Sequence, residues 1–83
     1  SAPAIAVYPN PVVTNLIIDF PDRGASYTIE IFDMQGNNIK NEIVSGQDKL
    51  NVPFREFTNG MYLLNIINTR AHQRTSYKIN KTE

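Results

Sequence analysis

The stretch that decides the fold is Asn59-Gly60-Met61-Tyr62-Leu63-Leu64-Asn65-Ile66-Ile67, in which a turn signal opens directly into the longest apolar run of the chain. Side chains of a β-strand alternate between its two faces. One face carries Tyr62, Leu64 and Ile66, and the other carries Met61, Leu63 and Ile67. Because both faces are apolar, we predict a central strand covered by a second sheet on one side and by long neighbouring side chains on the other. The Asn-Gly pair supplies the positive φ angle that a hairpin or corner needs.

Six further strands are predicted from short runs in which apolar and polar residues alternate. The apolar residues that mark them are Ile5 and Val7, then Leu16, Ile18 and Phe20, then Tyr27, Ile29 and Ile31, then Ile39, Ile43 and Val44, then Leu50, Val52 and Phe54, and finally Tyr77 and Ile79. Turn residues separate the runs, and no helical periodicity appears. Seven strands at this spacing predict one domain over residues 1–83. Its expected fold class is all-β, a seven-stranded antiparallel immunoglobulin-like β-sandwich.

Two of these runs have the features of edge strands. Lys40 and Glu42 lie within the fourth run, and charges at a sheet edge discourage pairing with other chains. Pro53 lacks a backbone N–H, so its run is predicted to lie at an edge or to end there. We assign Asp22 and Asp33 to turns, because aspartate side chains accept hydrogen bonds from nearby backbone groups.

Composition excludes several classes of function. The 83 residues contain eight Lys plus Arg against eight Asp plus Glu, so the chain lacks the basic field that binds nucleic acid. There is no cysteine, which excludes disulfides, thiolate metal sites and cysteine nucleophiles. No run approaches the roughly 18 apolar residues of a membrane-spanning helix, and the N-terminus shows no basic-then-apolar signal peptide. We therefore expect no nucleic-acid partner and no transmembrane segment.

The sequence contains no constellation of catalytic, cofactor-binding or metal-binding residues. His72 is the single histidine and lies in a polar turn, without a partner for a zinc site or a catalytic triad. Asp19, Asp22 and Asp33 lack the ligand spacing of a calcium loop. The serines lack a glycine-flanked nucleophile elbow, and the glycines are isolated turn residues that form no phosphate cradle. We expect no catalytic, cofactor or metal site, and we expect the domain not to be an enzyme on its own.

Four motifs are more specific than a generic sandwich requires. In chain order they are Tyr8-Pro9-Asn10-Pro11, Ile31-Phe32-Asp33-Met34-Gln35-Gly36, Asn59-Gly60-Met61-Tyr62, and the pair Lys78 and Lys81. Together and in this order they resemble the type A C-terminal sorting domain of the type IX (Por) secretion system of Gram-negative bacteria. The resemblance runs from about Ala6 to Lys81 and so covers nearly the whole chain.

This resemblance implies a secretion signal at the end of a larger cargo protein, which can itself be an enzyme such as a protease. The type IX translocon would recognise the domain in the periplasm and direct the cargo across the outer membrane. A sortase-like peptidase would then cleave the domain, and the cargo would stay on the outer membrane surface or be secreted. The residues that match the family by position, and that we assign to translocon recognition, are Pro9, Asn10, Pro11, Gly60, Tyr62, Lys78 and Lys81.

The same residues also have structural interpretations. The segment Pro9-Asn10-Pro11 fixes two φ angles and predicts a rigid bend. Tyr62 is expected to be a core residue whose hydroxyl finds a partner near a corner of the sandwich. We expect the edge of the last strand to accept a partner strand, while Arg74, Lys78 and Lys81 steer the domain toward an acidic surface. The alternative is that these are ordinary solvated charges on an edge strand.

Two other functions fit a small β-sandwich. One is an accessory carbohydrate-binding or spacer module of fibronectin type III kind. A sugar-binding face needs exposed, coplanar aromatic rings, and this chain has no Trp, while Tyr8, Tyr27 and Tyr77 are expected to be in the core or scattered. The other is a homophilic assembly domain that forms an edge-strand dimer.

Overall fold

The computed structural model describes residues 4–83, which form two β-sheets and no helix. The strands are β1 Ala6–Tyr8, β2 Asn15–Asp19, β3 Ser26–Asp33, β4 Asn38–Ser45, β5 Lys49–Pro53, β6 Gly60–Asn68 and β7 Gln73–Lys81. The three-stranded sheet has the order β1-β2-β5, and the four-stranded sheet has the order β4-β3-β6-β7. All neighbouring strands are antiparallel. The predicted all-β sandwich of seven antiparallel strands is confirmed.

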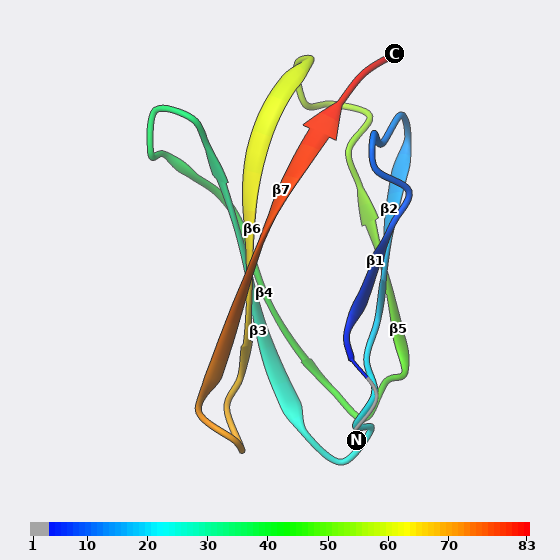
Figure 1. The fold of residues 1–83 in the computed structure, drawn as a ribbon, viewed down its shortest axis with the longest axis vertical. Coiled ribbons are helices and arrows are strands. Elements are labelled where there is room, and N and C mark those ends of the chain that lie inside the picture. Colours follow the sequence, from blue (N-terminus) through cyan, green and yellow to red (C-terminus); the bar gives the residue numbers. More distant parts are fainter. Residues whose placement is uncertain (1–3) are drawn as a thin grey trace.

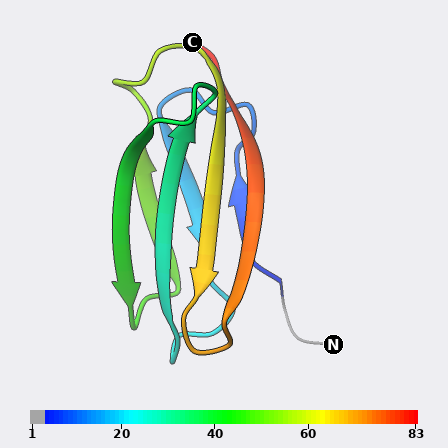
Figure 2. The ribbon, with the colours of Figure 1, turned by 90° about the vertical axis from the view of Figure 1, so that its left-hand side faces the viewer.

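The two sheets face each other along a long axis of 34 Å (Figures 1 and 2). β6 pairs with β3 on one side and with β7 on the other, so the longest apolar run forms a central strand, as predicted. β4 and β7 are the edges of the four-stranded sheet, and β1 and β5 are the edges of the three-stranded sheet. Pro53 is the last residue of β5. Both edge positions predicted from the sequence are therefore confirmed.

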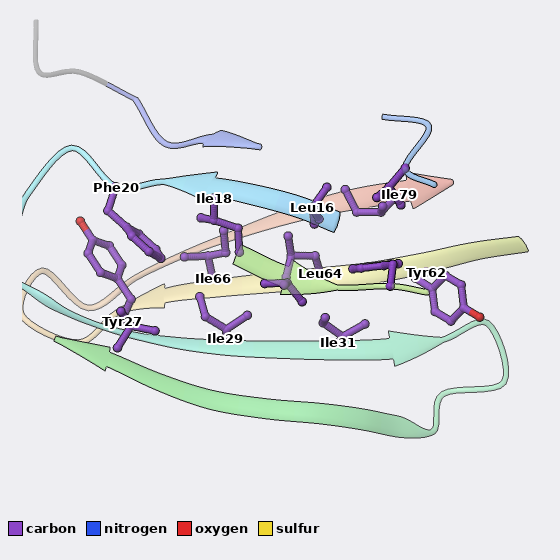
Figure 3. Close-up of a cluster of buried hydrophobic side chains, with 14 of the residues drawn as sticks. Leu16, Ile18, Phe20, Tyr27, Ile29, Ile31, Tyr62, Leu64, Ile66 and Ile79 are labelled. Carbon is purple, nitrogen blue, oxygen red and sulfur yellow. The ribbon is translucent and has the colours of Figure 1, made fainter. Parts of the chain in front are cut away.

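The core lies between the sheets and consists of the inward-facing side chains of both (Figure 3). The fully buried hydrophobic residues are Leu16, Ile18, Tyr27, Ile29, Ile31, Val52, Phe54, Leu64, Ile66 and Ile79, together with Val12 from the connection between β1 and β2. The rings of Phe20 and Tyr27 stack with their centroids 4.4 Å apart. Burial of each large apolar side chain contributes about 1.5–3 kcal/mol, so this layer is the main source of stability.

The outer face of the four-stranded sheet, which faces the viewer in Figure 2, is covered by side chains of the sheet itself. Met61 is 40% exposed and Ile43 is 76% exposed, whereas Leu63 is half-buried. Asn65 lies at the centre of this face and is 7% exposed, and its Oδ1 accepts a hydrogen bond from Ser76 Oγ at 2.7 Å. Neighbouring side chains thus cover the centre of the face, as predicted, and its rim is in contact with solvent.

Asp33 organises the hairpin between β3 and β4. Its Oδ1 accepts hydrogen bonds from the backbone N–H groups of Gln35 at 3.0 Å and Asn37 at 2.9 Å, and its Oδ2 accepts one from Asn37 Nδ2 at 3.1 Å. These hydrogen bonds, that of the Asn37 backbone foremost, hold the pKa of the Asp33 carboxyl below its usual value of 3.8. In the earlier turn, Asp22 Oδ1 accepts a hydrogen bond from the N–H of Gly24 at 2.9 Å. Both aspartates therefore have the turn roles predicted for them.

Candidate recognition surface along the last strand

The segment Pro9-Asn10-Pro11 lies against the last strand, although Asn10 and Lys78 are 68 positions apart in the chain. Asn10 Nδ2 donates a hydrogen bond to the carbonyl of Lys78 at 2.9 Å, and Asn10 Oδ1 accepts one from the N–H of Asn80 at 2.9 Å. The peptide bonds before both prolines are cis. The structure therefore brings together two of the predicted site residues, Asn10 and Lys78, through the backbone of β7.

Val12 extends this contact toward the end of the chain. Its N–H donates to the carbonyl of Asn80 at 2.8 Å, and its carbonyl accepts from the N–H of Thr82 at 2.9 Å. Val12 also forms a parallel bridge with Lys81. The connection between β1 and β2 thus crosses to the edge of the four-stranded sheet, at the end of the sandwich where β7 finishes (Figure 1).

These contacts divide the outer edge of β7 into a closed half and an open half. Alternate residues of a strand direct their backbone groups to the same edge. Arg74 and Ser76 therefore present their N–H and C=O groups outward, in line with those that Asn10 and Val12 occupy. Within residues 4–83, no backbone group pairs with this part of the edge. The edge predicted to accept a partner strand is thus limited to the open half of β7, Gln73–Tyr77.

Gly60 and Tyr62 form the corner from which β6 begins. Gly60 has a φ of 144°, a conformation that side-chain-bearing residues rarely adopt. Tyr62 is buried, and its hydroxyl donates a hydrogen bond to the carbonyl of Thr58 at 2.6 Å. Its ring packs against Phe54 and Phe57, with centroid distances of 5.8 and 5.4 Å. This is the tyrosine corner of an immunoglobulin-like sandwich, and the predicted partner for the Tyr62 hydroxyl is confirmed.

Lys81 does not lie on the surface, where it was expected to steer the domain toward an acidic partner. It shares the inward face of β7 with Ile79 and is 6% exposed, whereas Lys78 points into solvent. Lys81 Nζ donates hydrogen bonds to Asn59 Oδ1 at 3.4 Å and to the carbonyl of Thr82 at 3.2 Å. The expected surface position is therefore wrong for Lys81, and its assignment to translocon recognition stays a prediction. Strand alternation was the signal that could have predicted its burial, because Lys81 follows Ile79 by two positions.

An open hollow of about 450 Å³ lies beside Lys81 at this end of the sandwich. Its lining includes Arg55, Phe57, Thr58, Asn59, Lys81 and Glu83. Sequence reasoning did not assign Arg55 to any site. It lies in the loop between β5 and β6, and the fold alone brings that loop beside the end of β7.

The remaining polar and aromatic residues do not form the sites that other functions require within residues 4–83. His72 lies in the turn between β6 and β7 with a φ of 55°, as the turn assignment predicted. The described part of the chain has no group of three or more His, Cys, Asp or Glu side chains placed to hold a metal ion. Among residues 4–83 there is also no helix that could cross a membrane. Tyr8 is 40% exposed whereas Tyr27 is buried, so the tyrosines considered for a sugar-binding face do not share one exposed surface.

An antiparallel sandwich of seven strands in two sheets defines an immunoglobulin-like β-sandwich domain. Residues 6–81 match the secretion system C-terminal sorting domain, and the chain belongs to that family. The resemblance noted in the sequence is thereby confirmed. The chain is a C-terminal sorting signal of type IX secretion, which interacts with the secretion system and directs a secreted protein across the outer membrane. A sorting signal is not itself a catalyst.

Solved structures with the same fold include two bacterial proteins. A DUF3244 family protein from Bacteroides vulgatus, described as an immunoglobulin-like β-sandwich, has a TM-score of 0.82 and 18% identity over 94% of this chain and 84% of that chain. PorZ from Porphyromonas gingivalis, an essential bacterial surface component of the type-IX secretion system, has a TM-score of 0.76 and 16% identity over 95% of this chain. The match spans 11% of PorZ. These likenesses show the fold alone, which is the predicted immunoglobulin-like one. No curated protein matches the chain.

Proposed function

We propose that residues 1–83 form a single sorting domain at the C-terminal end of a larger cargo protein, and that the translocon recognises the folded sandwich along the last strand. The observation that supports this is the open half of β7, where Arg74 and Ser76 present backbone donors and acceptors to the outside. Addition of a partner strand to an exposed sheet edge is a recurring mode of recognition. Lys78, which is exposed beside this half, would favour an acidic partner.

The predicted recognition residues have different roles in this proposal. Lys78 contacts the translocon directly. The segment Pro9-Asn10-Pro11 keeps the other half of the edge closed, so that an incoming strand has one place to pair. Gly60 and Tyr62 fix the corner from which β6 begins, and β6 pairs with β7 along its length. Lys81 takes part in recognition from its buried position beside the hollow at the end of β7.

The course of export follows from this role. The domain is recognised in the periplasm, and the cargo passes through the outer membrane. A sortase-like peptidase then removes the domain, which leaves the cargo on the cell surface or free in the medium. The domain performs no chemistry, and any enzymatic activity, such as proteolysis, belongs to the cargo.

A fusion experiment tests the proposal. The chain is attached to the C-terminus of a periplasmic reporter in a bacterium that has a type IX system, and the reporter is then located by surface labelling and fractionation. We expect the reporter on the surface or in the medium. Retention of the intact fusion in the periplasm of a secreting host would contradict the proposal. In a strain without the translocon, the same fusion is the control and should remain periplasmic.

The open edge could instead pair with a second copy of the chain, as the dimer alternative requires. Sedimentation of the purified domain at several concentrations separates the two. If the domain stays monomeric at every concentration, the open edge is available to a different partner. A dimer formed at low concentration would favour the assembly domain. Binding to a polysaccharide array would favour the accessory carbohydrate-binding module.

A further inference from the structure

The hollow beside Lys81 contains a buried cation without a buried anion. Lysine is almost never as buried as Lys81 unless its ammonium group is paired. Both of its acceptors are neutral oxygens, Asn59 Oδ1 at 3.4 Å and the Thr82 carbonyl at 3.2 Å. These hydrogen bonds are longer than the 2.7–2.9 Å typical of an ammonium group with a carboxylate. The ammonium group therefore retains the capacity to bind a closer, charged acceptor.

No carboxylate of the described residues supplies that acceptor. Within residues 4–83 the one ion pair joins Arg70 Nη1 and Asp22 Oδ2 at 3.8 Å, at the opposite end of the sandwich from the hollow. Glu83 lines the hollow but forms no ion pair with Lys81 or with Arg55. Two cationic side chains thus share one hollow, and neither forms an ion pair with any of residues 4–83.

The size and polarity of the hollow indicate what can enter it. Its volume of about 450 Å³ falls within the ~300–1,000 Å³ of typical ligand pockets. The lining combines the cations Lys81 and Arg55 and the carboxylate of Glu83 with the carboxamide of Asn59 and the ring of Phe57. Such a lining suits a carboxylate that enters on a side chain, because the cations and amide bind its oxygens while the ring packs against its carbon atoms.

We infer that this hollow binds the carboxylate of an Asp or Glu side chain of the secretion machinery, with Lys81 and Arg55 as the two cations. The inference rests on the proposed function, since it identifies the chemistry of the partner that docks beside β7. Lys81 acts here as a buried anchor for one acidic group, whereas Lys78 and Arg74 are solvent-exposed. The closed half of the edge, held by Asn10, lies along the same end of β7 and fixes the strand that carries Lys81.

Acetate is a direct probe of this site. Amide chemical shifts of the purified chain are recorded by NMR as sodium acetate replaces sodium chloride at constant ionic strength. We expect saturable shifts at Asn59, Lys81 and Thr82. These shifts should disappear in Lys81→Met, which keeps an unbranched side chain one atom shorter and removes the charge. They should remain in Lys78→Met, the matched change on the solvent face. Absence of saturable shifts in the unmodified chain, or their persistence in Lys81→Met, would overturn the inference.

Asn59→Asp tests the pairing while keeping the lysine. The new carboxylate would lie where Asn59 Oδ1 now accepts the hydrogen bond of Lys81. It should therefore pair with the Lys81 ammonium group and keep an external carboxylate from binding there. We expect this variant to lose acetate binding and to lower export of the reporter fusion at least ~10-fold, since loss of one partner from a buried charge pair has an effect of this order or more. Lys81→Arg should retain part of both activities. Normal export of Asn59→Asp would contradict the inference.

The carboxylate of Glu83 competes with an external carboxylate for the hollow, and the variant Glu83→Gln distinguishes these two occupants. If the hollow is kept for an external carboxylate, Glu83→Gln leaves the acetate affinity unchanged. Tighter acetate binding by Glu83→Gln would assign the hollow to the chain's own glutamate and overturn the inference. Failure here is distinct from failure of the proposed function. If the unmodified fusion is exported but the chain does not bind acetate, only the carboxylate site is refuted. If the unmodified fusion is not exported, the sorting role itself is refuted.

Discussion

The Tyr62 hydroxyl stabilises the corner of the sandwich by donating one short hydrogen bond to the carbonyl of Thr58 at 2.6 Å. Tyr62→Phe keeps the ring and leaves that carbonyl without its donor. We expect a loss of about 1 kcal/mol in the free energy of unfolding, measured by urea denaturation. Tyr8→Phe is the matched control, because Tyr8 is exposed and makes no hydrogen bond through its hydroxyl within residues 4–83. An unchanged midpoint for Tyr62→Phe would contradict the role of the corner.

Asp33 gives the hairpin a pH dependence whose sign follows from its hydrogen bonds. The pKa of the folded-state carboxyl is lowered from 3.8, with the backbone N–H of Asn37 as the largest cause. A lowered pKa stabilises the fold above the unfolded-state value, and this stabilisation is lost as the pH falls through the folded-state value. The difference in unfolding free energy between the unmodified chain and Asp33→Asn should therefore be constant above about pH 5 and shrink below pH 3.8. A difference that grows on acidification would refute this assignment.

At the scale of the strand, Asn10 closes half of the β7 edge with two hydrogen bonds of 2.9 Å. Asn10→Ala removes both, and we expect a loss of about 1–2 kcal/mol in the free energy of unfolding. The uncovered edge should also increase self-association, because unpaired strand edges are templates for other chains. Denaturation and sedimentation measure the two effects. Asn10→Asp keeps the acceptor for Asn80 and loses the donor to Lys78, so an intermediate stability is expected.

The open half of β7 can be blocked without breaking its ladder to β6. Arg74 directs its N–H outward, so Arg74→Pro removes a donor from the free edge, where proline is tolerated. Loss of one intermolecular hydrogen bond of about 0.5–1.5 kcal/mol predicts export reduced by roughly 2- to 10-fold. Arg74→Ala removes the charge alone and should change export less. Equal export of Arg74→Pro and Arg74→Ala would show that the edge is not where the partner strand binds.

At the scale of the whole molecule, local alternation predicted the strands, the central place of β6 and the buried face of β3 correctly, because each depends on residues two positions apart. The closure of β7 could not be predicted in this way. It joins residues that are 68 and 70 positions apart in the chain, through a side-chain amide that carries no periodic signal. Lys81 is a different case, since alternation placed it inward and its charge suggested the surface. Its aliphatic stem and two neutral acceptors allowed the inward position.

The whole fold also decides how a truncation should be interpreted. Deletion of Ser76–Glu83 should trap the reporter in the periplasm, but it also removes Ile79 from the core and the strand that pairs with most of β6. We therefore expect this variant to lose cooperative thermal unfolding, followed by circular dichroism, so that its export defect reports on folding as well as on recognition. Arg74→Pro and Asn59→Asp should unfold cooperatively and still be exported poorly. Export of the truncated chain would place the signal outside β7. If the truncated chain were not exported while both point variants were exported normally, the translocon would require only a folded sandwich.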